Sequence, residues 1–383
     1  MRIGIVTLPL NNNYGGILQA YALQTILERE GHEVVIFDNC FTYKNERPLW
    51  KQMILVGIRL FQKYMLRKSL KVFSERTLEK EYPIIKGELT SFVEHHLHLF
   101  YIRNLASIPI ERFDAIVIGS DQIWRPSYIV NMWQSKPEDA FLYTIRKSPN
   151  IKILSYAASF GVDKWEYDAV STERIKKAIA RFQGISVRED SSVSLCTRYL
   201  SVQATHVLDP TLLLSDQDYI GLLKNKREKD CFNGLLDYIL DYSKEKSEWI
   251  RRISNERNLK VYSVNRNYMD LSLPIEERIL PSLETWLLSF MNASFVVTDS
   301  FHACVFAILF HKPFIVIGNK ERGLERFKSL LKQFELEDHL ILTISDYDPS
   351  QSYNIPASVY QKLKEKRAAS INFLRTSLAD SAV

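Results

Sequence analysis

Short runs of β-branched and apolar residues alternate with longer segments of helical period along most of this chain. Such alternation is typical of parallel sheets covered by helices, so it predicts an α/β fold. The first strands are expected at Ile3–Thr7, Val34–Phe37, Ala115–Ile118, Lys152–Tyr156, Ile185–Val187 and His206–Leu208. A turn signal at Asp209-Pro210-Thr211 ends this series. A second series follows, with strands near Leu235–Leu240, Lys260–Val264, Phe295–Val297, Phe314–Ile317 and Leu340–Thr343.

The segments between these strands have the period of helices. They are Ile17–Glu30, Lys51–Phe73, Leu78–His96, Thr172–Arg181 and Ala303–Phe310. At about 150 residues per domain, a chain of 383 residues is expected to hold two domains. We place the N-terminal domain at 1–210, the C-terminal domain at 211–350 and a charged, helical C-terminal segment at 351–383.

Composition narrows the classes of function. The 50 basic and 45 acidic side chains give a formal charge of +5, far below the excess expected of a protein that coats nucleic acid. The 4 cysteines are scattered singly, which indicates neither a disulfide framework nor a structural metal. The first residues lack the features of a signal peptide, and no apolar run approaches about 18 residues. The sequence therefore predicts a cytoplasmic protein without a nucleic-acid partner.

Two polar loops are expected at the carboxyl ends of first-domain strands, where open α/β sheets bind ligands. One loop carries Asn13, Tyr14, Gly15 and Gly16, and the other carries Ser120, Asp121, Gln122 and Trp124. A glycine-rich turn before a helix can hold an anion, and a carboxylate such as Asp121 can act as a base. The alternatives are a simple tight turn in the first loop and a helix N-cap in the second.

A third polar loop joins the strand Phe295–Val297 to the apolar helix that follows. It contains Ser300 and His302, and His302 is expected in the first helical turn. The helix dipole disfavours an imidazolium there unless an anion is bound, so protonation of His302 and phosphate binding would be coupled. The alternative is a capped helix with a buried, neutral histidine.

Basic residues follow strands in both domains. Lys320, Arg322 and Arg326 come after Phe314–Ile317, and Arg188 ends the strand Ile185–Val187. Guanidinium groups match carboxylate and phosphate oxygens, which a small dianionic substrate would present. For Arg188 the alternative is a surface ion pair with its acidic neighbours.

The segment Lys51–Phe73 has a distinct charge pattern, with no acidic residue from Lys51 to Ser74. Its apolar face carries Ile54, Ile58, Phe61 and Met65, and a basic stripe opposite carries Arg59, Lys63, Arg67 and Lys71. A helix that lies on an anionic membrane surface has this pattern. The alternative is a helix packed on the core with a solvated basic face.

Seven signatures, in this order along the chain, resemble those of the polysaccharide pyruvyl transferase family. They are Asn12-Asn13-Tyr14-Gly15 with Leu18-Gln19-Ala20-Tyr21, Gly119-Ser120-Asp121-Gln122-Ile123-Trp124, Tyr156-Ala157-Ala158-Ser159-Phe160-Gly161, Ser186-Val187-Arg188-Glu189, Leu208-Asp209-Pro210-Thr211, Thr298-Asp299-Ser300-Phe301-His302 and Arg322-Gly323-Leu324-Glu325-Arg326-Phe327. The resemblance extends to about Leu342. It implies two Rossmann-like domains that face each other across a cleft, similar to the GT-B glycosyltransferases.

The resemblance further implies phosphoenolpyruvate as the donor and a sugar of a bacterial surface polysaccharide as the acceptor, joined as a pyruvate ketal. Donor contacts are then implied for Arg188, His302 and either Lys320 or Arg322, beside Ser300 and Arg326. The first-domain loops would hold the acceptor, free, nucleotide-linked or lipid-linked, and the basic helix points to the lipid-linked form at the inner face of the membrane. This chain has Ala303 where members often have glycine.

The chemistry of ketal formation suggests roles for these residues. His302 would deliver a proton to the methylene carbon of the donor, Asp121 would act as base on the acceptor side, and the arginines would hold carboxylate and phosphate. No metal-ligand cluster is evident, so we expect no metal and no cofactor besides the donor substrate. Two other readings stay open: a GT-B glycosyltransferase that uses a nucleotide sugar, and a non-catalytic sugar or anion sensor.

Overall fold

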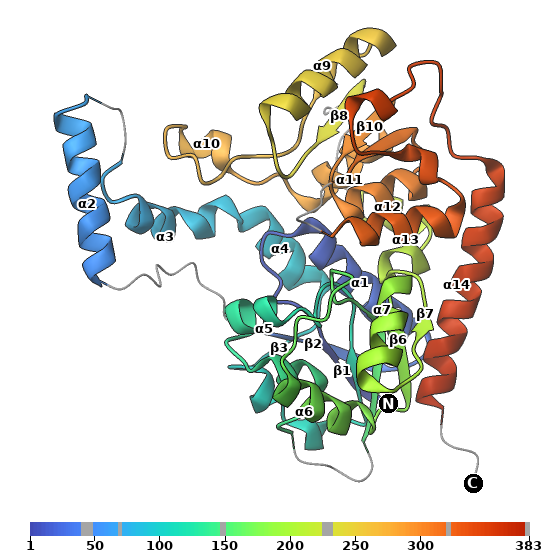
Figure 1. Ribbon diagram of the computed structural model, residues 1–383. Helices are drawn as coiled ribbons and strands as arrows, with labels where there is room; N and C mark the ends of the chain where they lie inside the picture. The colour runs from blue at the N-terminus through green and yellow to red at the C-terminus, as the bar shows by residue number, and fades with distance from the viewer. Residues whose placement is uncertain (40–48, 68–70, 146–150, 224–232, 319–322, 380–383) are drawn as a thin grey trace.

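The computed structural model describes residues 1–39, 49–67, 71–145, 151–223, 233–318 and 323–379. It contains two sheets, one above the other in Figure 1, each surrounded by helices. The last helix, α14 (Ala357–Leu378), runs beside both (Figure 1). Among the described residues, no helix combines the length and the apolar character needed to cross a membrane.

All neighbouring strands in both sheets are parallel. The first sheet has the order β3-β2-β1-β4-β5-β6-β7, with β1 (Arg2–Val6), β2 (Glu33–Asp38), β3 (Leu99–Tyr101), β4 (Ala115–Ile118), β5 (Lys152–Ala158), β6 (Gly184–Val187) and β7 (Thr205–His206). The second has the order β12-β11-β10-β8-β9, with β8 (Leu235–Tyr238), β9 (Val261–Tyr262), β10 (Phe295–Thr298), β11 (Phe314–Ile317) and β12 (Leu340–Ile341). The predicted α/β fold with two Rossmann-like domains is confirmed, and β3 is a strand that the sequence did not predict.

The central strands are apolar along their whole length because helices cover both faces of each sheet. Every residue of β4, β10 and β11 is buried. One core cluster reaches from Ile5 of β1 to Val296 of β10, so a continuous apolar interior joins the two domains.

The described helices are α1 (Tyr14–Arg29), α2 (Leu49–Tyr64), α3 (Ser74–Ile85), α4 (Gly87–His96), α5 (Pro126–Trp133), α6 (Ala169–Ile179), α7 (Asp190–Leu195), α8 (Asp216–Gly221), α9 (Lys244–Arg257), α10 (Ile275–Arg278), α11 (Leu283–Met291), α12 (Phe301–Leu309), α13 (Leu324–Phe334) and α14. The sequence did not predict α5, α7, α8, α9, α10, α11 and α13. The predicted helices lie close to observed ones, with one clear exception. The exception is the stretch from Lys51 to His96, where two long helices were predicted and three shorter ones are present.

The prediction of one helix over Lys51–Phe73 was wrong at its carboxyl end. Helix α2 stops at Tyr64, and Arg67 has a positive φ of 50°, a left-handed conformation that no α-helix continues through. The basic stripe is therefore broken: Arg67 and Lys71 lie outside α2. Arg59 instead faces α3, where its two terminal nitrogens bond both carboxylate oxygens of Glu75 at 2.5 and 2.7 Å.

The C-terminal helix α14 ties the domains together. Near its start Val359 belongs to the core cluster shared by both sheets. Further along, Arg367 Nε donates to Leu212 O at 2.8 Å, and Lys152 of the first sheet donates to Leu378 O at 2.6 Å. The helix thus lies across both domains.

Each sheet reverses its strand order at one point. In the first sheet the reversal lies between β1 and β4, and in the second it lies between β8 and β10. The carboxyl ends of the strands at such a reversal are where open α/β sheets bind ligands. The loops after β1, β4 and β10 therefore lie where a ligand is expected to bind.

Candidate active site

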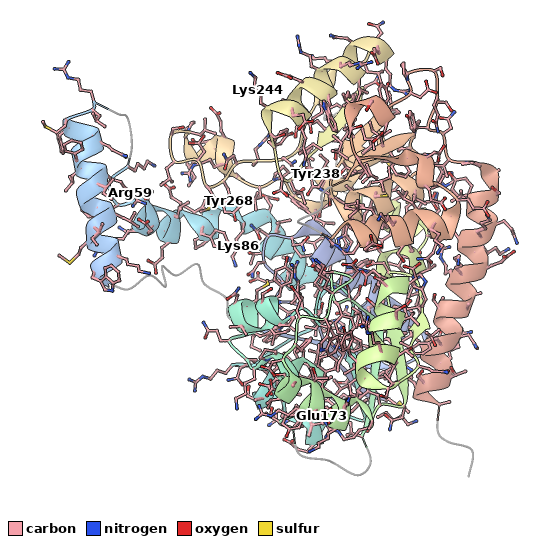
Figure 2. All side chains as sticks on the ribbon, viewed as in Figure 1. Arg59, Lys86, Glu173, Tyr238, Lys244 and Tyr268 are labelled. Carbon is pink, nitrogen blue, oxygen red and sulfur yellow. The ribbon has the colours of Figure 1, made fainter. Side chains whose placement is uncertain are left out.

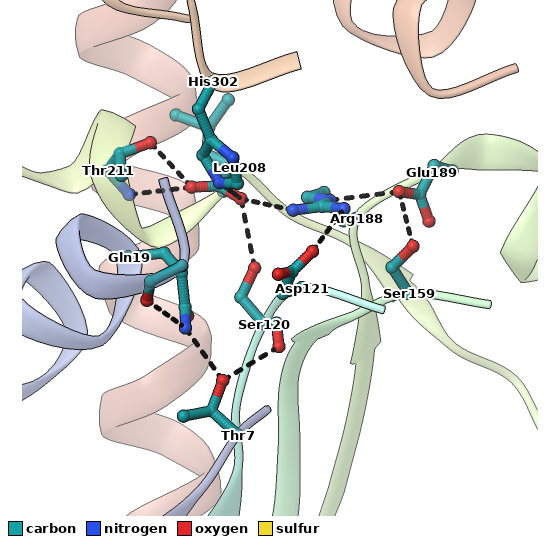
Figure 3. Close-up of polar contacts among 12 residues, drawn as sticks. Thr7, Gln19, Ser120, Asp121, Ser159, Arg188, Glu189, Leu208, Thr211 and His302 are labelled. Atoms are coloured by element: carbon teal, nitrogen blue, oxygen red, sulfur yellow. Dashed lines mark hydrogen bonds and ion pairs between the residues drawn. The ribbon is translucent and has the colours of Figure 1, made fainter. Parts of the chain in front are cut away.

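Side chains from the ends of four strands meet between the two sheets (Figure 3). Asp121 follows β4, Arg188 follows β6, Asp209 comes after β7, and His302 follows β10. All four are at least nine-tenths buried. The fold thus brings together the three residues predicted as catalytic, and it adds Asp209.

Arg188 is the centre of this group. Its Nη1 donates to Asp209 Oδ2 at 2.8 Å, its Nε donates to Glu189 Oε1 at 3.0 Å, and its Nη2 lies 3.8 Å from Asp121 Oδ1. Burial alone would lower the pKa of Arg188, but the three carboxylates raise it above its usual range, so the guanidinium stays charged. At 2% exposure it is not the surface ion pair that was the alternative for this residue.

One face of the Arg188 guanidinium lies on an aromatic ring. Its central carbon is 4.3 Å from the centroid of Phe301, the first residue of α12. Nη2 has no hydrogen-bond partner although it is buried. A charged N–H group without a partner is costly in a protein interior, so this atom is suited to an anionic oxygen.

Asp209 binds residues of both predicted sites through its two oxygens. Oδ1 accepts from the backbone and the hydroxyl of Thr211, at 3.0 and 2.6 Å. Oδ2 accepts from Arg188 and from Ser120 Oγ at 3.1 Å, and it lies 3.7 Å from His302 Nε2. Burial would raise the pKa of Asp209, but His302 and Arg188 hold it below its usual range. A single carboxylate therefore fixes three neighbours.

His302 sits in the first turn of α12, as predicted. Ser300 is the N-cap and accepts from Ala303 N at 3.5 Å. Burial lowers the pKa of His302, with Arg188 and Arg326 adding to the effect and the carboxylates opposing it, so the imidazole is neutral near pH 7. This matches the buried, neutral histidine of the alternative interpretation. However, Nε2 is left without a hydrogen bond and faces Asp209, which that interpretation does not explain.

Gly15 is what lets His302 occupy this place. A Cβ atom added at Gly15 would lie 2.0 Å from Nδ1 of His302 and 2.6 Å from its Cβ. The first turn of α1 and the first turn of α12 therefore approach each other as closely as a glycine permits. The glycine-rich loop thus contacts a second-domain residue directly.

Arg326, on α13, is the second arginine of this region. It is 8% exposed, and its guanidinium lies 5.9 Å from the ring of Phe301, which also contacts Arg188. Burial, with repulsion from Arg188, lowers the pKa of Arg326 to about 10. Lys320 and Arg322 lie outside the described residues.

The predicted acceptor residues divide into two groups. Asn13 and Ser120 reach the cluster, since Asn13 Nδ2 donates to Asp121 Oδ2 at 3.4 Å and Ser120 bonds Asp209. Asp121 itself has a positive φ of 61°, a costly backbone conformation of the kind found at functional sites. Asn13 and Ser120 thus bond the carboxylates of Asp121 and Asp209, and both carboxylates lie beside Arg188.

The residues of the second group make packing contacts and hydrogen bonds outside the cluster. Tyr14 donates to Pro281 O at 2.7 Å and stacks on Trp286, so it joins the two domains. Trp124 is fully buried and stacks on Phe141. Gln122 accepts from Arg125 at 3.2 Å, and Gly16 packs close to Asn13.

Sequence reasoning gave no role to Asp209 or Glu189. Glu189 accepts from Ser159 at 2.8 Å and from Ser192 at 3.1 Å, besides holding Arg188. Both acids lie within the seven signatures, and both follow strands of the first sheet. Position at the same sheet edge as Ser120 and Arg188 is the signal that could have found them.

The cluster has the groups needed to bind an anion and move a proton. Arg188 offers the N–H group of Nη2, His302 offers its neutral Nε2, and Asp121 offers a carboxylate that lies 3.8 Å from Arg188 Nη2. Among the described residues, no three His, Cys, Asp or Glu side chains are arranged to hold a metal ion.

Solved structures similar to this chain have low sequence identity to it. A UDP complex of MnaA from S. aureus has 13% identity and a TM-score of 0.45, and the match covers 95% of this chain and 87% of that one. UDP-GlcNAc 2-epimerase from Neisseria meningitidis has 11% identity and a TM-score of 0.45, with 97% and 94% covered. The UDP-GlcNAc 2-epimerase from Methanocaldococcus jannaschii has 13% identity and a TM-score of 0.43, with 97% and 93% covered. No curated protein matches the chain.

The family comparison is more informative than these likenesses. The model of one protein family, described as polysaccharide pyruvyl transferase, matches residues 13–321, which is most of the chain. The match includes Asp121, Arg188, Asp209 and His302. It also marks the protein as a transferase. The chain therefore belongs to the polysaccharide pyruvyl transferase family.

Proposed function

We propose that this protein moves the pyruvate group of phosphoenolpyruvate onto two hydroxyls of a sugar, as a ketal, and releases phosphate. The sugar would belong to a surface polysaccharide, such as a capsule or exopolysaccharide, or to its precursor. The observation that carries the proposal is the pair of buried nitrogens, Arg188 Nη2 and His302 Nε2, which have no hydrogen-bond partner and each lie beside a carboxylate, that of Asp121 and that of Asp209 respectively.

The donor is a small molecule with a carboxylate and a phosphate, and the site has matching groups. Arg188 stays charged and offers Nη2, and Arg326 brings a second guanidinium to the ring of Phe301. The N-terminus of α12, nine residues long, adds the positive end of a helix dipole next to His302. Together these features favour a small dianion over a neutral sugar at this end of the site.

His302 is proposed as the acid. It is neutral before the donor binds, because burial lowers its pKa. The negative charge of a phosphate beside it opposes this effect, so the donor and a proton would bind together. The proton then goes to the methylene carbon of the donor, which becomes a methyl group. The neighbouring carbon becomes an electron-poor centre that an acceptor hydroxyl attacks.

The protons of the two acceptor hydroxyls complete the proton balance of the reaction. When the first hydroxyl adds, its proton replaces the one that His302 delivered. Phosphate then leaves, the second hydroxyl attacks the same carbon, and its proton leaves with the phosphate. Asp121 is proposed as the base that takes the proton of the second hydroxyl and passes it to the departing phosphate, because its carboxylate faces Arg188 from the first-domain side. No redox step is involved.

The experiment is a comparison of ligands by thermal stabilisation, because a ligand that binds the native state raises its stability. Phosphoenolpyruvate is compared with inorganic phosphate and with a set of nucleotide sugars, in the wild type and in Arg188→Ala and His302→Ala. Stabilisation by phosphoenolpyruvate that both substitutions weaken would support the proposal. Stabilisation by a nucleotide sugar alone would favour a glycosyltransferase and would contradict it.

A further inference from the structure

Helix α2 projects from the body of the molecule on an arm made by α3 (Figure 1). One face of α2 is apolar and exposed. Met53 is 74% exposed, and the other exposed residues of this face are Trp50, Ile54, Ile58, Leu60, Phe61 and Tyr64. Met65 and Leu66, just past the helix, are exposed as well. A soluble monomer rarely exposes so many large apolar side chains in one place, so this face marks an interaction site.

The opposite side of α2 is the one that contacts the protein. There Arg59 lies between α2 and α3 (Figure 2) and bonds Glu75 of α3. Leu55 and Val56 are partly buried. The expectation of a helix packed on the core by its apolar face is therefore wrong for α2, because the large apolar side chains point away from the body. The packing contact is made instead by the opposite side, which carries Arg59 together with Leu55 and Val56.

Charge and aromatic residues indicate what the apolar face binds. No acidic residue occurs from Lys51 to Ser74, and Lys51 and Lys63 on α2 are exposed. Trp50 and Tyr64 lie at the two ends of the exposed face, and such side chains favour the boundary between water and lipid. An amphipathic helix with basic flanks and aromatic residues is typical of contact with an anionic bilayer.

A second copy of the chain fits this surface less well. A symmetric contact would place α2 against the α2 of the other copy, and each has basic residues with no acidic residue between Lys51 and Ser74 to pair with them. The like charges would repel at close range. An anionic lipid surface, in contrast, attracts every basic residue that approaches it.

We propose that α2 docks the protein on the surface of an anionic lipid bilayer, lying in the plane of the interface with Trp50, Met53 and Phe61 inserted. Lys51 and Lys63 contact lipid phosphates. The proposal is independent of the reaction proposed above, because it rests on a surface outside the active site.

The arm has contacts that fix its direction relative to both domains. Arg278, the fully buried last residue of α10, pairs with Glu81 of α3. Leu280 N donates to Ile85 O at 2.9 Å. Docking through α2 would therefore hold the whole body in a defined orientation to the membrane, which suits a substrate that is attached to lipid.

The test is co-sedimentation of the full chain with vesicles. Phosphatidylcholine vesicles are compared with vesicles of phosphatidylcholine and phosphatidylglycerol. Three double variants are used: Met53→Gln/Phe61→Gln in the apolar face, Lys51→Glu/Lys63→Glu in the basic flanks, and Lys177→Glu/Lys364→Glu as a control. The control residues are exposed on α6 and α14, and the control changes the net charge by the same amount.

The expected result is binding to the anionic vesicles and weak binding to the neutral ones. Each basic residue near an anionic surface strengthens binding about fivefold, so reversing two should weaken it by more than about 25-fold. The apolar variant should also lose binding, and the control should keep it. All substituted side chains are exposed, so thermal unfolding should stay close to that of the wild type.

Fluorescence gives a second readout, because Trp50 is the one exposed residue among the six tryptophans. Its emission should shift to shorter wavelength with anionic vesicles, and Trp50→Phe should remove the shift. Failure of the wild type to bind anionic vesicles would overturn the proposal. So would equal binding by the Lys51→Glu/Lys63→Glu variant, or a stable dimer that Met53→Gln/Phe61→Gln makes monomeric.

Discussion

The substitution Gly15→Ala tests whether the close approach of the two domains builds the site. The added Cβ would lie 2.0 Å from His302 Nδ1, 2.1 Å from Cγ and 2.6 Å from Cβ. Since non-bonded heavy atoms prefer about 3.5–4.0 Å, the imidazole must move by roughly 1.5 Å. The contact includes His302 Cβ, so a rotation of the ring alone does not relieve it.

The expected effects on stability and on function differ in size. Overpacking costs about 1–3 kcal/mol, and replacing glycine by alanine inside a helix returns up to about 1 kcal/mol, so the net loss of stability is about 0–3 kcal/mol. A displacement of about 1 Å in a site can cost about a hundredfold in function. Gly15→Ala should therefore remain folded while losing most of its donor binding.

The assay is thermal stabilisation by phosphoenolpyruvate. At a concentration about 100 times the wild-type Kd, the wild type gains about 2.7 kcal/mol, and a variant that binds a hundredfold more weakly gains about 0.4 kcal/mol. Gly221→Ala is the matched control, because a Cβ at that helical position meets nothing within 4 Å. If Gly15→Ala kept the full stabilisation, the site would not depend on the contact between Gly15 and His302, and the reasoning would be refuted.

Three further predictions follow from the same contacts. Arg188→Lys should unfold at lower temperature and lose phosphoenolpyruvate binding, because an ammonium group cannot make the three contacts of the guanidinium; a calorimetric titration showing wild-type affinity would contradict this. Asp209→Asn should cost about 3 kcal/mol of stability and weaken donor binding, whereas Glu138→Gln, which breaks the pair of another buried carboxylate with the partly exposed Arg174, should cost a smaller amount of stability and leave donor binding unchanged. Binding of phosphoenolpyruvate should take up about one proton near neutral pH, because the pKa of His302 is lowered in the free protein and rises in the complex. The affinity for phosphoenolpyruvate should therefore fall as the pH rises. Calorimetric titrations in buffers of different ionisation enthalpy measure the proton uptake, and His302→Gln should abolish it.

The parallel sheets could be predicted because their central strands are apolar throughout. The predicted strands Ala115–Ile118 and Phe314–Ile317 coincide with β4 and β11. In contrast β3 is only three residues long, and it exists through pairing of Phe100 with Phe37 rather than through a pattern of its own. Strand β3 was therefore missed, although the short edge strands β7, β9 and β12 overlap predicted strands.

The active-site cluster was predicted in part. Arg188, His302 and Asp121 all follow strands, so the topology rule for open sheets was enough to single them out. The role of Asp209 depends on three contacts that no local pattern encodes: the hydroxyl of Ser120, the guanidinium of Arg188 and the imidazole of His302. Such convergence is a property of tertiary packing.

The arm shows the limit of helical periodicity. The apolar period runs through Met65, and nothing in it reveals the left-handed residue Arg67 that separates α2 from α3. The period also does not say which face packs against the protein. The ion pair of Arg59 with Glu75 decides that, and it leaves the apolar face exposed.

The most direct test of the central claim is a crystal structure of the complex with phosphoenolpyruvate. The account predicts one molecule of donor between the two sheets, with its anionic oxygens bonded to Arg188 Nη2 and to His302 Nε2, the two buried nitrogens that lack partners. Phosphoenolpyruvate bound elsewhere, with both nitrogens still unpartnered, would contradict it.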